Sequence, residues 1–480
     1  MRLTPLILGL GFWLSPFCSA AESPLSDPIL DQMLLSASFQ DVTSGAMLFS
    51  KDPDQKLCPA SLTKLFTTAA ALVDLGPEWA PYTTIGYTGE IKKGVLKGDL
   101  VFLGGGDSFL VSEELGRLVR ELKQKGLELV EGNLLIDHSL YGHFEDKWRV
   151  QDTNSTGAYN APLSAFAVNF NTVSVAISPG ELGQKALMTL DPVPLDNIQL
   201  ENKTLTVSKG KKSSVTVTRK ILDSGKVLLI AEGPVSQESE LLHFYRDLPQ
   251  GETSGYLVKA FLVEAGIKLS GKIRSQNQPV PSMRFFHKFK GRSLDQVLTG
   301  INKYSNNFMS DMLLLTLGQI NDHSAKNILQ QGLGTVRSFL KDTVHIKQDF
   351  VLQDGSGLST QNLFSAKQVT DLLTYMAQQP LIFSYYLLTL PTPGGYGSLK
   401  NRFSSPKENE ALMVQAKTGT LTAPKVVSNL AGYLYVQKKW VAFAILLNSK
   451  TQADAQYVSK GRAFHEKLVQ YVYKSQQNRS

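Results

Sequence analysis

Cysteine is almost absent from this chain. Among its 480 residues only Cys18 and Cys58 occur, and Cys18 lies in a segment, residues 1–21, that we expect to be removed. The mature chain would then hold one thiol, which excludes an intrachain disulfide. We expect Cys58 to be a small buried apolar side chain, because free cysteine is one of the most buried residue types.

Long apolar segments are lacking as well. The apolar run from about Leu3 to Leu14 is too short to span a bilayer, and no later segment is long enough. The run follows a positive charge at Arg2 and precedes small residues, with cleavage expected after Ala20 or Ala21. This pattern is typical of a secretory signal peptide. We therefore predict an exported protein that is soluble in the periplasm.

Clusters of metal-binding residues are missing too. The seven histidines are scattered, and none has the spacing of zinc ligands. The glycine-rich stretch at residues 104–107 lacks the lysine and the spacing of phosphate-binding loops. The sequence therefore predicts no metal and no other cofactor.

The charge of the chain is moderately basic, with a formal net charge of +7. Basic residues cluster between Lys209 and Lys220 and again along the C-terminal segment. Such clusters are usually solvated faces, although in an exported protein they would also favour peripheral association with anionic membrane or wall polymer. Nucleic acid is not an expected partner, because no recognition helix or aromatic RNA-binding motif is present.

The length of the chain excludes a single ordinary core, so two or three domains are expected. A strand pair is expected between Leu35 and Ser50, with a helix after it. From about residue 81 short β-rich runs are expected to pair, 83–87 with 95–102 and 213–219 with 226–231, and they are interrupted by one helix that Ser112 would cap and Gly126 would end. Helical texture returns near Glu252, a capping box of Ser365 and Gln368 is expected to begin a helix at about 366–378, and three β-runs and a long helix close the chain. We predict an α/β (α+β) protein in which residues 22–80 and 251–480 form one domain. Residues 81–250 would be one or two mostly-β inserted domains.

Three short motifs occur in a meaningful order: Ser61-Leu62-Thr63-Lys64, Ser305-Asn306-Asn307 and Lys417-Thr418-Gly419. Each alone is common by chance. Together, in this order and in these local contexts, they are typical of the active site of penicillin-recognising serine acyltransferases.

The first motif pairs a nucleophile with a base. Ser61 and Lys64 lie one turn apart on a helix expected from about Ser61 to Leu75, so their side chains share a face. A serine hydroxyl needs a nearby base, and a lysine serves if burial and neighbouring cations lower its pKa. The positive end of the helix would stabilise an oxyanion at Ser61.

The second motif follows one expected helix and begins another. There Ser305 could pass a proton to a leaving amine, and Asn307 could hold a substrate amide. Two alternatives remain open: a simple helix cap, and a register in which Tyr304-Ser305-Asn306 is the Y-x-N pattern of class C β-lactamases. We prefer the serine register.

The third motif is expected at the end of an alternating strand. A strand edge beside the nucleophile would align a peptide by backbone hydrogen bonds. Lys417 would place positive charge in the site, Thr418 would bind a terminal carboxylate, and Gly419 would let the backbone approach closely. The N–H groups of Thr420 and Ser61 would form the oxyanion hole.

Over nearly its whole mature length the chain resembles the class C low-molecular-mass penicillin-binding proteins, the D-alanyl-D-alanine carboxypeptidase/endopeptidases of peptidase family S13. Besides the three motifs, the resemblance rests on these segments: Ser44-Gly45, Pro59-Ala60, residues 104–107, Tyr159-Asn160-Ala161-Pro162, Asp354-Gly355-Ser356-Gly357-Leu358-Ser359 and Gly397-Ser398-Leu399. The long gap between the first two motifs is also similar. Two departures are Ser310-Asp311, where the family usually has Ala-Glu, and Ser108-Phe109, where Pro-Thr is usual.

The resemblance implies a serine β-lactamase/transpeptidase-like catalytic domain and assigns roles to residues. Ser61 would be acylated, with Lys64 as its base and Ser305 and Asn307 in proton relay and substrate holding. Lys417 and Thr418 would bind substrate. The family pattern also implies that Asp354 and Ser356 shape the rim of the site.

The resulting hypothesis is a serine-type D-Ala-D-Ala carboxypeptidase and DD-endopeptidase. It would act on peptidoglycan stem peptides, with β-lactam antibiotics as inhibitors. Two rivals stay open at this point: a β-lactamase, which differs in the rate of deacylation, and a non-catalytic wall-binding protein that keeps the fold.

Overall fold

The computed structural model describes residues 23–142, 157–248, 252–321, 327–403, 412–452 and 454–478. The expected signal peptide, residues 1–21, lies outside this set. Within the described residues no helix is long and apolar enough to cross a membrane. The chain mixes helices and sheets, as the predicted α/β (α+β) class requires.

The centre of the main part is a five-stranded antiparallel sheet in the order β18-β19-β20-β1-β2. Its strands are β1 (Met33–Asp41), β2 (Met47–Lys51), β18 (Met413–Leu421), β19 (Val427–Val436) and β20 (Lys439–Ser449). The chain ends therefore meet in one sheet, with β18 on its edge. The expected strand pair between Leu35 and Ser50 is confirmed by β1 and β2.

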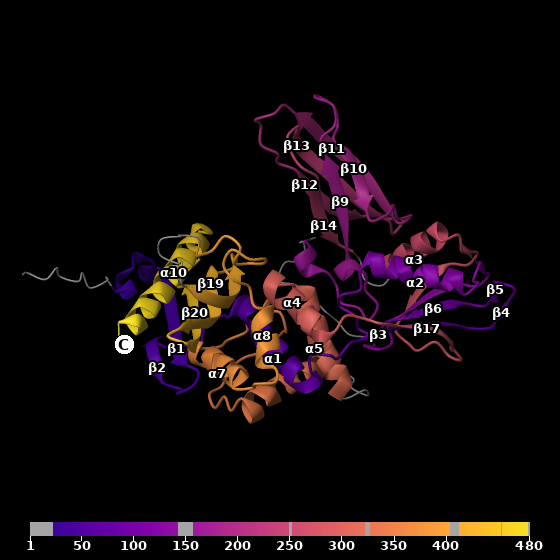
Figure 1. Cartoon of the computed structure of the whole chain (residues 1–480). Coiled ribbons are helices and arrows are strands. Elements are labelled where there is room, and N and C mark those ends of the chain that lie inside the picture. The colour runs from indigo at the N-terminus through magenta and orange to yellow at the C-terminus, as the bar shows by residue number, and fades with distance from the viewer. Residues whose placement is uncertain are drawn as a thin grey trace, which may run out of the picture.

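Both faces of this sheet are covered by helices (Figure 1). Alternate residues of β20 enter two different cores, because successive side chains of a strand point to opposite faces. Ala442 and Ala444 join the core that contains α7 (Ala366–Ala377), and Phe443 and Ile445 join the core that contains α10 (Gln456–Gln477).

The helical layer on the α7 side carries the first two motifs. Its other helices are α1 (Thr63–Leu75), α4 (Leu294–Tyr304), α5 (Asn307–Asn321), α6 (Ile328–Ser338) and α8 (Phe383–Thr389). The helix expected from Ser61 to Leu75 is confirmed, with a short 3-10 turn, η3 (Ala60–Leu62), at its start. It ends where Gly76 takes a φ of 78°.

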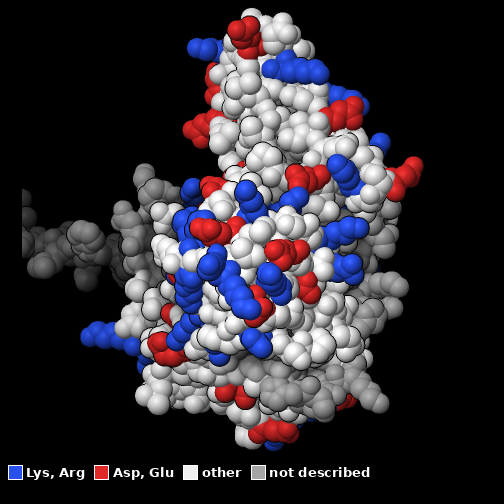
Figure 2. All heavy atoms as spheres, turned by 90° about the vertical axis from the view of Figure 1, so that its right-hand side faces the viewer, with Lys and Arg blue, Asp and Glu red and all other residues white. Residues whose placement is uncertain are grey.

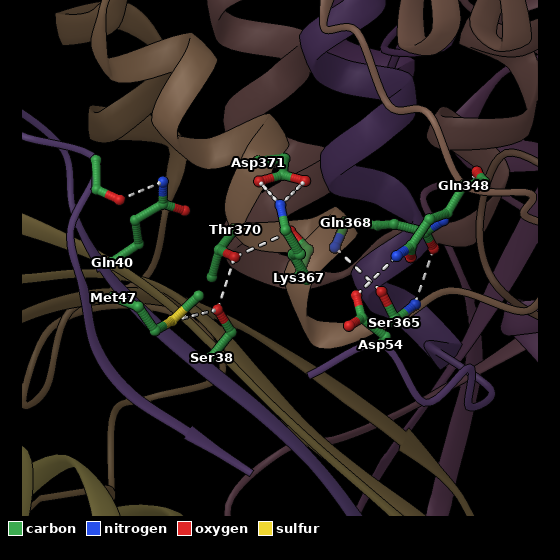
Figure 3. A network of polar contacts seen from close by, with 11 residues as sticks. Ser38, Gln40, Met47, Asp54, Gln348, Ser365, Lys367, Gln368, Thr370 and Asp371 are labelled. Atoms are coloured by element: carbon green, nitrogen blue, oxygen red, sulfur yellow. Dashed lines mark hydrogen bonds and ion pairs between the residues drawn. The ribbon is translucent and has the colours of Figure 1, made fainter. Parts of the chain in front are cut away.

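Polar contacts fix α7 on the sheet and on the segment before it (Figure 3). The predicted capping box of Ser365 and Gln368 is present: Ser365 Oγ accepts the Gln368 N–H, and Gln368 Oε1 accepts the Ser365 N–H. The Thr370 hydroxyl lies 2.9 Å from that of Ser38 in β1. Lys367 and Asp371 pair one turn apart. The helix α7 is thus tied to the central sheet.

The first inserted unit is built from two small sheets, in the orders β16-β8-β6-β3-β17 and β15-β7-β5-β4, with α2 (Ser112–Gln124) and α3 (Glu252–Glu264). Its strands are β3 (Tyr82–Tyr87), β4 (Glu90–Lys92), β5 (Val95–Lys97), β6 (Leu100–Leu103), β7 (Leu129–Val130), β8 (Leu134–Asp137), β15 (Lys268–Leu269), β16 (Ile273–Gln276) and β17 (Arg284–Lys290).

The end predicted for the inserted part at residue 250 does not match the strand pairing. β16 runs parallel to β8, and β17 pairs with β3, so the chain from 252 to 290 belongs to the first inserted unit. The helix α3 begins where the sequence predicts the second part of the main domain. Its partners are instead α2, β8, β15 and β16. In the same unit β3 pairs with β6 and β17, whereas β5 pairs with β4 and β7.

The second inserted unit is all β and projects away from the rest of the molecule (Figure 1). It has two three-stranded sheets, β10-β9-β14 and β11-β13-β12. Its strands are β9 (Thr172–Ser178), β10 (Leu187–Asp191), β11 (Ile198–Val207), β12 (Thr216–Ile221), β13 (Val227–Ser236) and β14 (Leu242–Asp247). The expected antiparallel pairing of the runs at 213–219 and 226–231 is confirmed by β12 and β13.

The start of α2 differs from the predicted cap. The N-cap position is Val111, and Ser112 is the first helical residue. The Ser112 N–H donates to Oδ1 of Asn169, which lies far along the chain. A remote side chain therefore supplies the acceptor that the local pattern assigned to Ser112. Gly126, with a φ of 92°, follows the end of this helix as expected.

Charges of both signs are interspersed on the face seen in Figure 2, which is the end of the molecule formed by the first inserted unit. Several of them pair, as Arg117 does with Glu121 and Arg292 with Glu114. This exposed face of the first inserted unit is therefore a mixed one.

Candidate active site

The three motifs meet at a cavity of about 830 Å³ beside the edge strand β18. Ser61 comes from η3, Asn307 from the start of α5, and Thr420 from β18. Positions more than 350 residues apart in the sequence thus line one hollow. Among the described residues no group of His, Cys, Asp or Glu has the arrangement of a metal site.

Ser61 follows a strained residue. Ala60 has a φ of 46°, in the left-handed region that residues with a side chain rarely adopt. Strain of this kind costs of the order of 1–3 kcal/mol and persists only where packing imposes it. Ala60 is fully buried, whereas Ser61 is only half-buried. The turn therefore presents the Ser61 hydroxyl to the cavity.

Lys64 lies below Ser61 and is fully buried. Its Nζ is 3.0 Å from Ser61 Oγ, 2.8 Å from Asn307 Oδ1 and 2.5 Å from the carbonyl oxygen of Ser356. A buried amine with three oxygen neighbours is held in one orientation. The first two motifs are thus joined through Lys64.

Ser305 links the second motif to the third. It ends α4 in a left-handed conformation with a φ of 58°, and its Oγ accepts a hydrogen bond of 2.9 Å from Lys417 Nζ. Asn306 caps α5, since its Oδ1 accepts the Met309 N–H. The helix-cap alternative thus applies to Asn306, whereas Ser305 contacts Lys417 of the third motif.

The positions of the side chains distinguish the serine register of the second motif from the Y-x-N register. Tyr304 is 63% exposed, whereas Ser305 Oγ contacts Lys417 and Asn307 Oδ1 contacts Lys64. The serine register is therefore the one whose side chains point into the site.

Lys417 lies within β18, not at the end of a strand as predicted, because β18 continues to Leu421. It is fully buried and donates to Ser305 Oγ and to the carbonyl oxygen of Thr418. Burial, and next the charge of Lys64, lower the pKa of Lys417 well below its usual value. Two buried amines in one site disfavour each other's protonation.

The backbone at Gly419 approaches another group closely, as expected, but that group belongs to this chain. A Cβ atom at this position would lie 2.6 Å from the carbonyl oxygen of Pro59. Glycine therefore lets β18 pack against the turn that carries Ser61. Thr418 Oγ1 lies 3.0 Å from Ser398 Oγ, and Thr420 is exposed to the cavity.

Asp354 and Ser356 do not lie at the rim of the site. Both are fully buried. The Asp354 carboxylate accepts the N–H groups of Gly357 and Ser359 and the side-chain amide of Asn362. Burial, and next the charge of Asp311, raise the pKa of Asp354 to about 6. The segment forms the floor below Lys64, because the carbonyl of Ser356 faces that lysine.

Comparison with known proteins agrees with this geometry. The family model described as the D-Ala-D-Ala carboxypeptidase 3 (S13) family matches residues 19–467. The chain belongs to this S13 family. A D-alanyl-D-alanine carboxypeptidase of Actinomadura sp. is 28% identical over 449 residues, which are 89% of this chain and 80% of that protein. The carboxypeptidase DacB of Haemophilus influenzae is 23% identical over 483 residues, 98% of each chain.

The fold of this S13 chain is also that of a solved structure. Penicillin binding protein 4 of Haemophilus influenzae superposes with a TM-score of 0.74 at 22% identity, covering 92% of this chain and 99% of that one. The transpeptidase-like class with inserted sheets is thus confirmed as the fold.

Two features of the S13 site were not given roles by the sequence. Tyr159 and Asn160, from the 3-10 turn η4 (Ala158–Asn160), line the cavity, and the Tyr159 carbonyl accepts a hydrogen bond from Asn307 Nδ2. Ser398 contacts Thr418. Both lie in segments that carried the family resemblance, and that resemblance was the only signal for them.

Cys58 has a structural place near the site. It is buried, and burial raises the pKa of its thiol to about 11. Its carbonyl accepts the side-chain amides of Asn429 and Asn448. The expectation of a small buried side chain is confirmed.

Proposed function

We propose that this chain hydrolyses D-Ala-D-Ala termini and D-alanyl crosslinks of peptidoglycan peptides through an acyl-enzyme at Ser61. It is a serine-type D-Ala-D-Ala carboxypeptidase and DD-endopeptidase. The observation that carries the residue roles is the pair of contacts from two buried lysines, Lys64 to Ser61 and Lys417 to Ser305. These contacts support a role for Lys64 as the base that activates Ser61 and for Ser305 as the proton relay to the leaving group.

Acylation begins when Lys64 takes the proton of the Ser61 hydroxyl. Ser61 Oγ bonds to the carbonyl carbon of the penultimate D-alanine, and the carbonyl oxygen becomes an oxyanion. The N–H groups of Ser61 and Thr420 would hold that oxyanion, and loss of one such donor costs on the order of 3–4 kcal/mol of barrier. Ser61 and Thr420 both line the cavity.

Collapse of this intermediate breaks the amide bond. The departing nitrogen receives a proton from the Ser305 hydroxyl, which is replenished by the proton that Lys64 took from Ser61. The lowered pKa of Lys417 lets it exchange a proton with Ser305 at moderate cost. Water then attacks the ester, with Lys64 as its base, and frees Ser61.

The substrate peptide would lie along β18. This strand is at the edge of its sheet, where an added strand could pair with it beyond Ala416, whose N–H already donates to the carbonyl oxygen of Pro391. Thr418 would bind the terminal carboxylate, with Ser398 beside it. Asn307 would hold a substrate amide, and the wall formed by Tyr159 and Asn160 would restrict the side chains admitted.

β-Lactam antibiotics would acylate the same serine, because they present a strained amide to it. We place the reaction in the periplasm after removal of residues 1–21. We further propose peripheral association with membrane or wall polymer through the basic residues between Lys209 and Lys220 and along the C-terminal segment. We treat the main part as the catalytic domain and both inserted units as additions to it.

The test is the intact mass of the protein after incubation with benzylpenicillin, for wild type and Ser61→Ala. We expect a lasting adduct of one drug molecule on wild type alone, together with release of D-alanine from a D-Ala-D-Ala peptide. Unmodified wild type with consumed drug would identify a β-lactamase. Unmodified wild type with intact drug, and no released D-alanine, would favour the non-catalytic wall-binding protein.

A further inference from the structure

The floor of the site is a turn whose peptide groups are held by buried side chains from three directions. The Gly355 carbonyl accepts the hydroxyl of Thr67 in α1, at 2.9 Å, and that of Ser310 in α5, at 2.7 Å. The Gly355 N–H donates to Oδ1 of Asp311, at 3.0 Å. The carbonyl and the N–H of Gly355 are thus both fixed by side chains of helices α1 and α5.

The other half of the turn is held by Asp354. Its Oδ1 accepts the Gly357 N–H at 2.7 Å and the Asn362 amide at 2.8 Å, and its Oδ2 accepts the Ser359 N–H at 2.6 Å. Gly357 has a φ of 79°, and a Cβ there would lie 1.8 Å from the carbonyl oxygen of Ala60. The turn is therefore wedged directly under the residue that precedes the nucleophile.

This rigid turn presents one group to the reactive amine, the carbonyl of Ser356, 2.5 Å from Lys64 Nζ. The carbonyl oxygen of Ser356 and the amide oxygen of Asn307 can only accept hydrogen bonds, whereas the Ser61 hydroxyl can also donate. A neutral amine has two hydrogens and one lone pair. When both hydrogens are directed to the two carbonyl oxygens, the lone pair is left facing Ser61 Oγ.

We propose that Asp311 and Asp354 are positioning residues for Lys64: they hold the turn so that the Ser356 carbonyl orients the amine lone pair toward Ser61. This inference rests on the proposed function, in which Lys64 is the base. It assigns a role to Asp311, which belongs to Ser310-Asp311, one of the two dipeptides where the chain departs from the usual family sequence. Ser310, the other half of that departure, supplies one of the two hydroxyls on Gly355.

The buried charges also set the proton equilibrium of the amine. Lys64 interacts electrostatically with Lys417 from β18, whereas Asp354, in the turn below Lys64, interacts with Asp311 from α5 and with Cys58. Asp311, Asp354 and both lysines are fully buried, so their charges interact with little screening. Removing a negative charge below Lys64 should therefore lower the pKa of its ammonium group.

The experiment compares Asp311→Asn, which keeps an acceptor for Gly355 but loses the charge, with Asp311→Glu, which keeps the charge. Two readouts are taken on the full chain: the NMR titration of the Lys64 ε-methylene in ¹³C-lysine-labelled protein, assigned by its absence in Lys64→Met, and the rate constant for acylation by benzylpenicillin across pH. We expect Asp311→Asn to lower the pKa of Lys64 and to move the acid limb of the acylation profile to lower pH. Asp311→Glu should restore both.

Asp354→Asn tests the turn itself. Because an asparagine cannot satisfy all three donors, the Ser356 carbonyl should shift, and a misplacement of about 1 Å costs roughly 10²-fold in acylation rate. Asp247→Asn is the matched control, since Asp247 is also a buried carboxylate but lies in the second inserted unit, paired with Arg219. It should lower the melting temperature and leave acylation unchanged.

The outcomes separate the two proposals. If Asp311→Asn leaves both the Lys64 titration and the acylation profile as in wild type while it lowers the melting temperature, the turn is only structural and the inference is wrong. If Lys64 responds as expected but wild type forms no penicillin adduct, the positioning network stands and the proposed function fails.

Discussion

The catalytic floor of this chain and its second inserted unit differ in which side chains stand in an unfavourable environment. At the catalytic floor Lys64, Lys417 and Asp354 are fully buried. In the second inserted unit, large apolar side chains such as Leu187 and Ile221 are 64% and 57% exposed. The first arrangement costs stability through desolvation and the second leaves apolar surface in water. The desolvation cost at the floor is offset by the hydrogen bonds that these buried charged groups make, and those same contacts hold them for chemistry.

The largest expected effect comes from removing a buried lysine of the site. Lys64→Met keeps the length and volume of the side chain but removes the base, so acylation by benzylpenicillin should fall by roughly 10²- to 10⁴-fold. The melting temperature should fall modestly, because the carbonyl oxygen of Ser356 and Oδ1 of Asn307 lose their buried donor. Stopped-flow acylation and calorimetry measure the two quantities.

The control for this prediction is Lys259→Met in α3. That lysine is 36% exposed and pairs with Asp196 at 2.6 Å, an exposed pair worth about 0–1 kcal/mol. Neither acylation nor stability should change measurably. Acylation of Lys64→Met at the wild-type rate would remove Lys64 from the mechanism.

The next largest effect is expected from a substitution at Gly357, and Gly183, which has the same φ, serves for comparison. Gly357 and Gly183 both have a φ of 79°, but a Cβ at Gly357 would collide with Ala60, whereas one at Gly183 has nothing within 4 Å. Gly183→Ala should cost only the left-handed strain, roughly 1–2 kcal/mol. Gly357→Ala should cost more and also slow acylation, because the Ser61 turn must move. Chemical denaturation measures the stability of the two variants, and penicillin labelling measures their acylation. Equal losses in the two variants would contradict the close packing of Gly357 against Ala60.

The next prediction concerns the pH dependence of stability that two buried acids, Asp107 and Asp354, produce. Burial raises the pKa of Asp107 from 3.8 to about 6, and that of Asp354 moves in the same direction. Between these values the folded chain binds more protons than the unfolded chain, so the free energy of unfolding falls as the pH rises from about 4 to about 6. Asp107 Oδ2 has no hydrogen-bond partner, unlike either oxygen of Asp354.

Asp107→Asn should therefore flatten part of this slope at little structural cost, since asparagine does not titrate. Denaturant titrations at several pH values between about 4 and 6 measure it. A slope equal to that of wild type would mean that Asp107 titrates at its ordinary pKa in the folded chain.

The smallest effect is expected in the second inserted unit. Leu187→Ser with Ile221→Ser removes exposed apolar groups, so the free energy of unfolding should change by no more than about 0.5 kcal/mol per site. Penicillin acylation should be unaffected. A marked loss of stability would show that these side chains are covered in solution.

Much of the site could be predicted from the sequence because its chemistry is local. Ser61 and Lys64 are one turn apart on a helix, and the helix and its end at Gly76 follow from nearby residues. The capping box of α7 is equally local. The placement of Asp354 in the floor could not be predicted, because burial depends on what packs against a turn. The family pattern suggested a rim, and α1 and α5 cover the segment instead.

By itself, the sequence determined which residues can carry out the chemistry, the family and most helices and strands, since these depend on residue type and short spacing. Only the tertiary structure decided where the inserted part ends, since the parallel pairing of β16 with β8 joins segments more than 130 residues apart. It also decided that Tyr159 from the inserted part walls the cavity. Contacts between distant segments arise from packing and desolvation of the whole chain, and no local pattern specifies them.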